Sequence, residues 1–172
     1  MIKTLLYLAI FLALFSIETS FIYSLPSPVD RIPLVITAVV FLYLYVGFPN
    51  VLWWMVFHGI LLDTFSLSFV PFHWLAYVAA AVVTLLASRH VFSNRSFYGV
   101  AATTTIAIAT LMIMEVLLAT LGSVFGSSQQ FFGAIVSVRL WGMGLGALLL
   151  LLIFPVAPKL KSTLGWVFQQ YR

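Results

Sequence analysis

The sequence contains no cysteine and very little charge. Its 172 residues include eight lysines and arginines and four aspartates and glutamates, so charged side chains make up 7% of the chain. The absence of cysteine excludes disulfide bonds, thiol catalysis and zinc–thiolate sites. Soluble domains are about a quarter charged, so a chain this poor in charge cannot cover a surface that faces water.

Hydrophobic residues take the place of the missing charge. They make up 63% of the chain, and its mean hydropathy is +1.17. This composition requires lipid as the solvent and predicts an integral membrane protein. The net charge of +4 does not indicate a nucleic-acid partner, because the basic residues are scattered between apolar runs and form no patch. The lipid bilayer is the expected surrounding.

Six apolar segments divide the chain. A helix that spans a bilayer needs about 20 mostly apolar residues, and prolines, glycines and polar clusters separate such runs here. The segments cover residues 4–25, 32–48, 51–63, 70–88, 97–121 and 131–157. They predict an all-α membrane protein with six transmembrane helices, which forms a single domain over residues 1–172.

The basic residues predict how these helices are oriented. With both termini in the cytoplasm, six of the eight basic residues lie on the cytoplasmic side, as the positive-inside rule expects. They are Lys3, Arg89, Arg95, Lys159, Lys161 and Arg172. After the sixth segment, residues 159–172 place apolar side chains near one helical face. This pattern is typical of a short interfacial helix, and a frayed tail fits it too.

Four ionisable residues fall inside the predicted spans: Glu18, Asp63, Glu115 and Arg139. A charge at the centre of a membrane helix costs about 2.5–3.5 kcal/mol on insertion scales, so such residues mark sites of structure or function. In the predicted topology all four lie in the outer half of the bilayer. Three interpretations stay open: bonds that fix helix packing, a pocket open to the outer face, and a proton or ion path.

Asp63 falls at the end of the third segment, where the helix dipole disfavours a negative charge. Its carboxyl group would pair with Arg139, carry a proton, or bond to loop groups such as Ser66. We expect the pair with Arg139, because both residues fall near the outer ends of their helices. Gly142 and Gly146 also give the helix of Arg139 a small-residue face that a neighbouring helix can approach.

The pattern contains no signature of an enzyme or a cofactor site. His58 and His73 are 15 residues apart and lack the close spacing of helical metal ligands. No serine–histidine–acid arrangement and no pair of carboxylates on one helix face is present. We therefore expect a protein that is not an enzyme and binds neither a cofactor nor a metal.

The stretch GILLDTFSLSFVPFHWLAY, residues 59–77, resembles the signature region of the MreD family of rod-shape-determining membrane proteins. That signature has a glycine, three apolar residues, an aspartate, a serine three residues later, a histidine ten residues after the aspartate, and Leu-Ala. The matching positions are Gly59, Asp63, Ser66, His73, Leu75 and Ala76. Phe69 and Pro71 depart from it, because the family usually has a proline and a glycine there.

The resemblance implies a non-enzymatic, multi-pass subunit of the bacterial cytoplasmic (inner) membrane. It would belong to the elongasome, which organises the cell wall, peptidoglycan synthesis and cell shape. Its direct partner would be an MreC-like protein. Through that protein it would assemble with the actin-like MreB, a SEDS glycosyltransferase such as RodA and a class B penicillin-binding protein.

A second class fits the same features: the substrate-binding subunit of an energy-coupling-factor vitamin transporter. These S-components are small six-helix membrane proteins whose fold is similar to that of the MreD family. They bind their ligand near the outer face and carry an Ala-xxx-Ala motif in the first helix, which Ala9 and Ala13 match. The stretch at residues 59–77 favours the MreD family.

Overall fold

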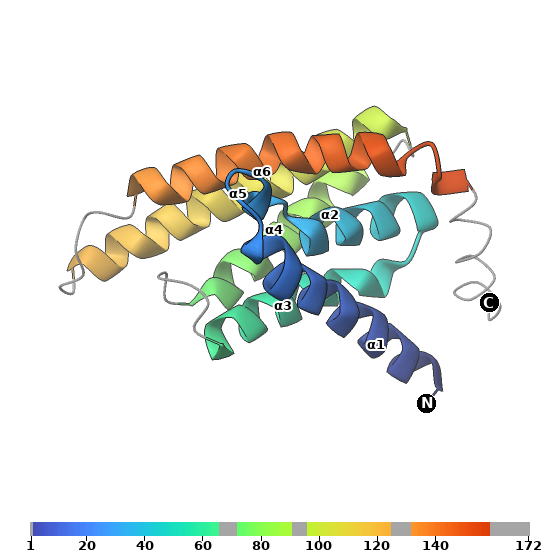
Figure 1. Cartoon of the computed structure of the whole chain (residues 1–172), viewed down its shortest axis with the longest axis horizontal. Coiled ribbons are helices and arrows are strands. Elements are labelled where there is room, and N and C mark those ends of the chain that lie inside the picture. Colours follow the sequence, from blue (N-terminus) through green and yellow to red (C-terminus); the bar gives the residue numbers. More distant parts are fainter. Residues whose placement is uncertain (1, 66–71, 91–95, 125–131, 159–172) are drawn as a thin grey trace.

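The computed structural model of the chain consists of helices and the turns between them (Figure 1). It describes residues 2–65, 72–90, 96–124 and 132–158, and these ranges contain no β-strand. The α-helices are α1 (Ile2–Ser16), α2 (Leu34–Phe41), α3 (Leu52–Thr64), α4 (His73–His90), α5 (Phe97–Val124) and α6 (Phe132–Ile153). Shorter π- and 3₁₀-helical turns are η1 (Ile17–Phe21), η2 (Ile22–Ser24), η3 (Val29–Arg31), η4 (Leu42–Val46) and η5 (Pro49–Val51).

These helices follow the six apolar segments of the sequence, so the prediction of an all-helical protein is confirmed for the described part of the chain. The first two segments are less regular than expected. In each of them an α-helix passes into a π-helical turn, η1 after α1 and η4 after α2. The interfacial helix that the sequence predicts for residues 159–172 lies outside the described residues.

Three helical stretches are long and apolar enough to cross a membrane. They are Leu5–Ser24, Phe97–Leu121 and Phe132–Ile153, and Leu34–Val46 is a shorter apolar helix. α3 has 13 residues and ends at Thr64, directly after Asp63. The length and composition of these helices are those of a membrane protein, whereas the count of six spans and the side of each terminus stay predictions.

Successive α-helices alternate in direction (Figure 1). In that view α1, α3 and α5 run from right to left, and α2, α4 and α6 run from left to right. The start of α1 and the end of α6 therefore lie at the same end of the bundle. α3 packs against α4, and α5 packs against both α4 and α6.

The small-residue face that the sequence predicts on α6 is a place of close packing. A Cβ atom at Gly142 would lie 3.5 Å from the carbonyl oxygen of Arg31. A Cβ atom at Gly146 would lie 3.3 Å from Thr37 Oγ1 and 3.4 Å from Pro33 Cγ. Both glycines are buried, so η3 and the start of α2 lie directly against the backbone of α6.

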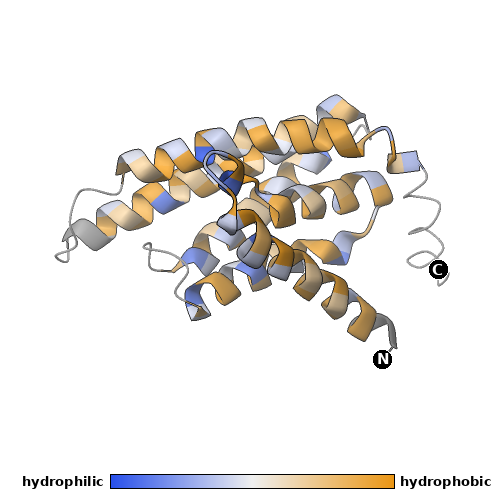
Figure 2. Cartoon of the chain, viewed as in Figure 1, coloured by the Kyte–Doolittle hydropathy of each residue, from blue (hydrophilic) through white to orange (hydrophobic). Residues whose placement is uncertain are grey.

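Apolar side chains fill the interior and also cover the outside. The core includes Phe11, Val35, Met55, Tyr77, Ile108 and Leu150, which come from all six α-helices. Large apolar side chains are exposed as well, and the hydrophobic colour predominates along the helices in Figure 2. Lipid is the solvent that suits so many exposed apolar side chains.

Two glycines on α6 offer a matched test of this packing. Gly146 faces α2, whereas a Cβ atom at Gly144 would meet nothing within 4 Å. We expect Gly146→Leu to lower the yield of folded protein, because overpacking costs about 1–3 kcal/mol or more, and Gly144→Leu to leave it unchanged. Size-exclusion chromatography of detergent extracts measures both. Equal losses in the two variants would contradict the close approach of α2 to α6.

Candidate functional site: a polar network between the helices

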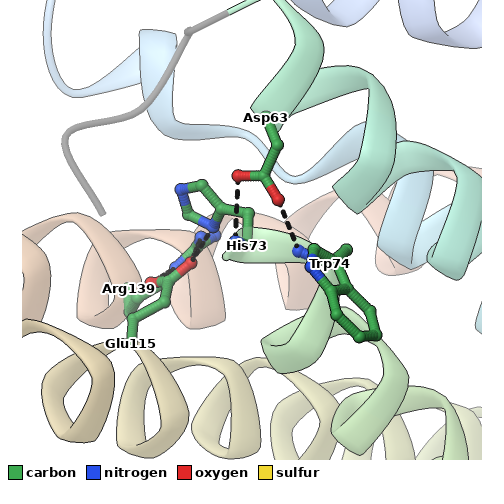
Figure 3. A network of polar contacts seen from close by, with 5 residues as sticks. All are labelled: Asp63, His73, Trp74, Glu115 and Arg139. Atoms are coloured by element: carbon green, nitrogen blue, oxygen red, sulfur yellow. Dashed lines mark hydrogen bonds and ion pairs between the residues drawn. The ribbon is translucent and has the colours of Figure 1, made fainter. Parts of the chain in front are cut away.

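Asp63 caps the N-terminus of the helix that follows its own. Its Oδ1 accepts a hydrogen bond from the backbone N–H of His73 at 2.9 Å, and its Oδ2 accepts one from Trp74 at 3.0 Å (Figure 3). The first N–H groups of a helix have no partner within it, and the helix dipole favours an anion at that end. The start of α4 therefore compensates for the unfavourable place of Asp63 at the end of α3.

Gly59, one helical turn before Asp63, brings α3 and α4 together. A Cβ atom at this position would lie 2.8 Å from Trp74 Cα and 3.0 Å from Tyr77 Cβ, closer than real Cβ atoms approach. Residues four apart share a helix face, so Gly59 and Asp63 both face α4. The glycine permits close contact, and the aspartate then bonds to the start of the neighbouring helix.

The backbone just before α4 is strained. Phe72 has a φ of 63°, in the left-handed region that residues with a Cβ atom rarely adopt. Such a conformation costs on the order of 1–3 kcal/mol and persists only where the surroundings hold it. The two bonds from Asp63 to the next residues and the close contact at Gly59 hold it here.

A buried ion pair joins α5 to α6. Arg139 Nε donates to Glu115 Oε2 at 2.8 Å, and Arg139 Nη2 donates to Glu115 Oε1, so the guanidinium group binds the carboxylate at two points. Glu115 is 2% exposed, and the side chain of Arg139 is 15% exposed. His73 Nδ1 lies 3.2 Å from Glu115 Oε1, which brings α4 to the same pair (Figure 3).

The other buried carboxylate, Glu18, lies on the π-helical turn η1. Its Oε2 accepts a hydrogen bond from the backbone N–H of Val35, the second residue of α2, at 2.6 Å. Tyr23 and Arg139 are both close enough to Glu18 to interact with it electrostatically. Glu18 thus bonds to the start of α2 in the way that Asp63 bonds to the start of α4. In both cases a carboxylate late in one helical segment accepts a hydrogen bond from the start of the next helix.

One further polar contact fastens the α1–α2 connection to α6. Arg31 Nη1 donates to Ser137 Oγ at 2.8 Å, and Arg31 Nε lies 3.9 Å from Asp30 Oδ1. Ser137 precedes Arg139 by two residues on α6. The α1–α2 connection therefore contacts α6 near the ion pair as well as at Gly142.

The expected pair between Asp63 and Arg139 is wrong. Both oxygens of Asp63 accept bonds from backbone N–H groups of α4, and the guanidinium group of Arg139 binds Glu115 on the adjacent helix. Of the alternatives for Asp63, bonding to groups beyond the end of its helix is the one observed, with donors at the start of α4. Ser66, which the sequence offers as such a donor, lies outside the described residues.

Two buried residues beside this network have no role in the sequence-based prediction. His58 on α3 is 0% exposed, and its ring centroid lies 5.5 Å from that of Phe15 and 5.0 Å from that of Tyr77. The ring of Tyr77 also lies 6.2 Å from that of His73, edge to face. The spacing of His73 and Tyr77 by one turn was the available signal, because it places both on one face of α4.

The chemistry of the network is that of holding helices together. Glu18, Asp63 and Glu115 each bond to a neighbouring helix, and Arg139 supplies the one cation that directly bonds a carboxylate among the described residues of the predicted spans. In the same ranges no group of three His, Cys, Asp or Glu side chains could hold a metal ion.

Comparison of the chain with protein-family models, with curated proteins and with solved structures finds no match.

The cap at α4 gives a graded prediction. Asp63→Ala removes both acceptors and should lower the free energy of unfolding by about 0.5–2 kcal/mol, the usual effect of losing an N-cap. Asp63→Asn keeps one acceptor oxygen and should cost less. Thermal unfolding of the purified protein in detergent measures both variants. Equal stability of Asp63→Ala and the wild type would contradict the cap.

The ion pair gives a prediction of coupling. Removing one partner of a buried pair leaves the other charge unpaired and costs about 3–5 kcal/mol, whereas replacing both by apolar residues can be nearly neutral. Glu115→Leu and Arg139→Met should each lower the amount of folded protein in the membrane, and the double variant should recover much of it. The matched control is Asp63→Ala with Arg139→Met, whose effects should add. Recovery in the control instead of the Glu115 pair would contradict the assignment.

Proposed function

We propose that the protein is a non-enzymatic scaffold subunit of the bacterial cell-elongation complex, similar to MreD. In this proposal it spans the cytoplasmic membrane six times with both termini inside. It binds an MreC-like protein and, through it, MreB, a RodA-like SEDS glycosyltransferase and a class B penicillin-binding protein. Its contribution to peptidoglycan synthesis and cell shape is then contact between subunits.

The observation that carries this proposal is the local unit formed by the signature residues. Gly59 allows α4 to contact α3, Asp63 caps α4, and His73 is both the capped residue and the neighbour of Glu115. The signature thus has a structural explanation at three of its positions. A scaffold binds its partners through the shape of its surface. Residues that fix the geometry of a helix pair therefore suit this function.

The satisfied state of the carboxylates supports the same proposal. A catalytic or transport site needs groups free to meet a substrate, whereas each described carboxylate in the spanning segments is bonded to a neighbouring helix. Such bonds favour the first of the three interpretations of the polar residues, the one in which they fix helix packing.

One observation fits the alternative as well, the substrate-binding subunit of an energy-coupling-factor vitamin transporter. Ala9 and Ala13 are both exposed on α1, so their Ala-xxx-Ala face is open to a neighbouring helix. A transporter subunit would use this face to contact its transmembrane coupling partner. A scaffold could use it equally, so the signature at residues 59–77 decides between the two.

The proposal predicts a shape phenotype and a partner. Deleting the gene in a rod-shaped host should make the cells round, because a missing scaffold uncouples wall synthesis from elongation. The tagged protein should co-purify with an MreC-like protein, as mass spectrometry of the mildly solubilised complex would establish. Rod-shaped deletion cells, together with co-purification of paired ATPases and a bound vitamin, would overturn the proposal in favour of the transporter.

A further inference from the structure

His58 is a buried histidine whose ring nitrogens have no partner among the described residues. The side chain is 0% exposed, and neither Nδ1 nor Nε2 makes a hydrogen bond. A neutral imidazole has one donor and one acceptor, and burying each without a partner is costly. An apolar residue of similar size would fill this position at no such cost.

Other buried polar side chains of the bundle show how a partner is usually found. Thr103 and Thr104 bond the carbonyl oxygens of the residues four before them on α5, at 2.8 and 2.9 Å. His58 makes no such bond, because neither of its ring nitrogens contacts a carbonyl group of α3 at hydrogen-bond distance. A partner for His58 must come from the space beside α3.

That space borders the ion-pair network. Tyr77 lies between the two histidines, with its ring 5.0 Å from that of His58 and 6.2 Å from that of His73. His73 Nδ1 likewise makes no hydrogen bond of good geometry, although it lies 3.2 Å from Glu115 Oε1. His58 is also close enough to Arg139 and His73 to interact with both electrostatically.

We propose that the region beside His58, Tyr77 and His73 is an internal binding site for water, which links His58 to the Glu115–Arg139 pair. Water is small, donates and accepts, and is the usual partner of buried polar groups that the protein leaves unpaired. The charges of the adjacent pair need no ion to balance them, because Arg139 already neutralises Glu115. A neutral guest that both donates and accepts fits the imidazole of His58.

This site would extend the network to the middle of α3. Asp63 ties the end of α3 to α4, and a water at His58 would tie the preceding part of α3 to α5 and α6. The inference does not depend on the proposed function, because it rests on the chemistry of one buried side chain.

The direct test is nuclear magnetic resonance of the wild-type protein in lipid nanodiscs, with ¹⁵N-labelled histidine. We expect magnetisation transfer from water to the His58 ring, which disappears in His58→Phe. His90, which is exposed on α4, is the internal control for contact with bulk solvent. A His58 ring with no water contact would overturn the proposal, and this measurement does not depend on how any variant folds.

Thermal unfolding of variants gives a second, independent test, because the proposal determines whether Tm falls or rises. If water bonds His58, His58→Phe removes a partner and should lower Tm by several degrees, while His58→Gln, which can donate and accept, should lower it less. If His58 has no partner, His58→Phe removes an unpaired polar group and should raise Tm. His90→Phe controls for the change of ring and should leave Tm unchanged. A raised or unchanged Tm in His58→Phe would overturn the proposal.

Discussion

The two-point pair between Glu115 and Arg139 is the interaction on which the arrangement of the last three helices depends. A guanidinium group cannot face lipid cheaply, so α6 must turn Arg139 toward a carboxylate. Glu115 supplies it on α5, and His73 brings the start of α4 to the same oxygen. With the rotation of α6 fixed in this way, Gly142 and Gly146 face η3 and α2, and the first half of the chain packs against the second.

The first two helix pairs are built on one repeated device. In each, a carboxylate in the later part of one helical segment accepts bonds from backbone N–H groups at the start of the next: Glu18 for α2, and Asp63 for α4. The carboxylate accepts hydrogen bonds from backbone N–H groups that have no partner within their own helix. The helix dipole in turn stabilises the negative charge of the carboxylate. Of the four acidic residues, two therefore accept hydrogen bonds from backbone N–H groups, and a third forms an ion pair with Arg139.

The sequence was sufficient to predict the helices and the small-residue face of α6 that contacts its neighbours. Apolar runs broken by proline and glycine give the six segments, and the spacing of Gly142 and Gly146 gives one shared face. The partner of Arg139 could not be derived, because three acids fall at similar depth and the pattern does not fix how each helix rotates. The donors of Asp63 and Glu18 were hidden for another reason: they are backbone N–H groups, which every residue but proline carries.

The packing of the bundle depends on a specific pairing, in which Arg139 binds Glu115 and Asp63 binds the start of α4. Solid-state nuclear magnetic resonance in lipid bilayers tests it through dipolar couplings between ¹⁵N-labelled arginine side chains and ¹³C-labelled carboxylates. We expect a strong coupling that Glu115→Gln abolishes and Asp63→Asn leaves intact, in agreement with the 2.8 Å contact between Arg139 Nε and Glu115 Oε2. A coupling that survives in Glu115→Gln and is lost in Asp63→Asn would contradict it.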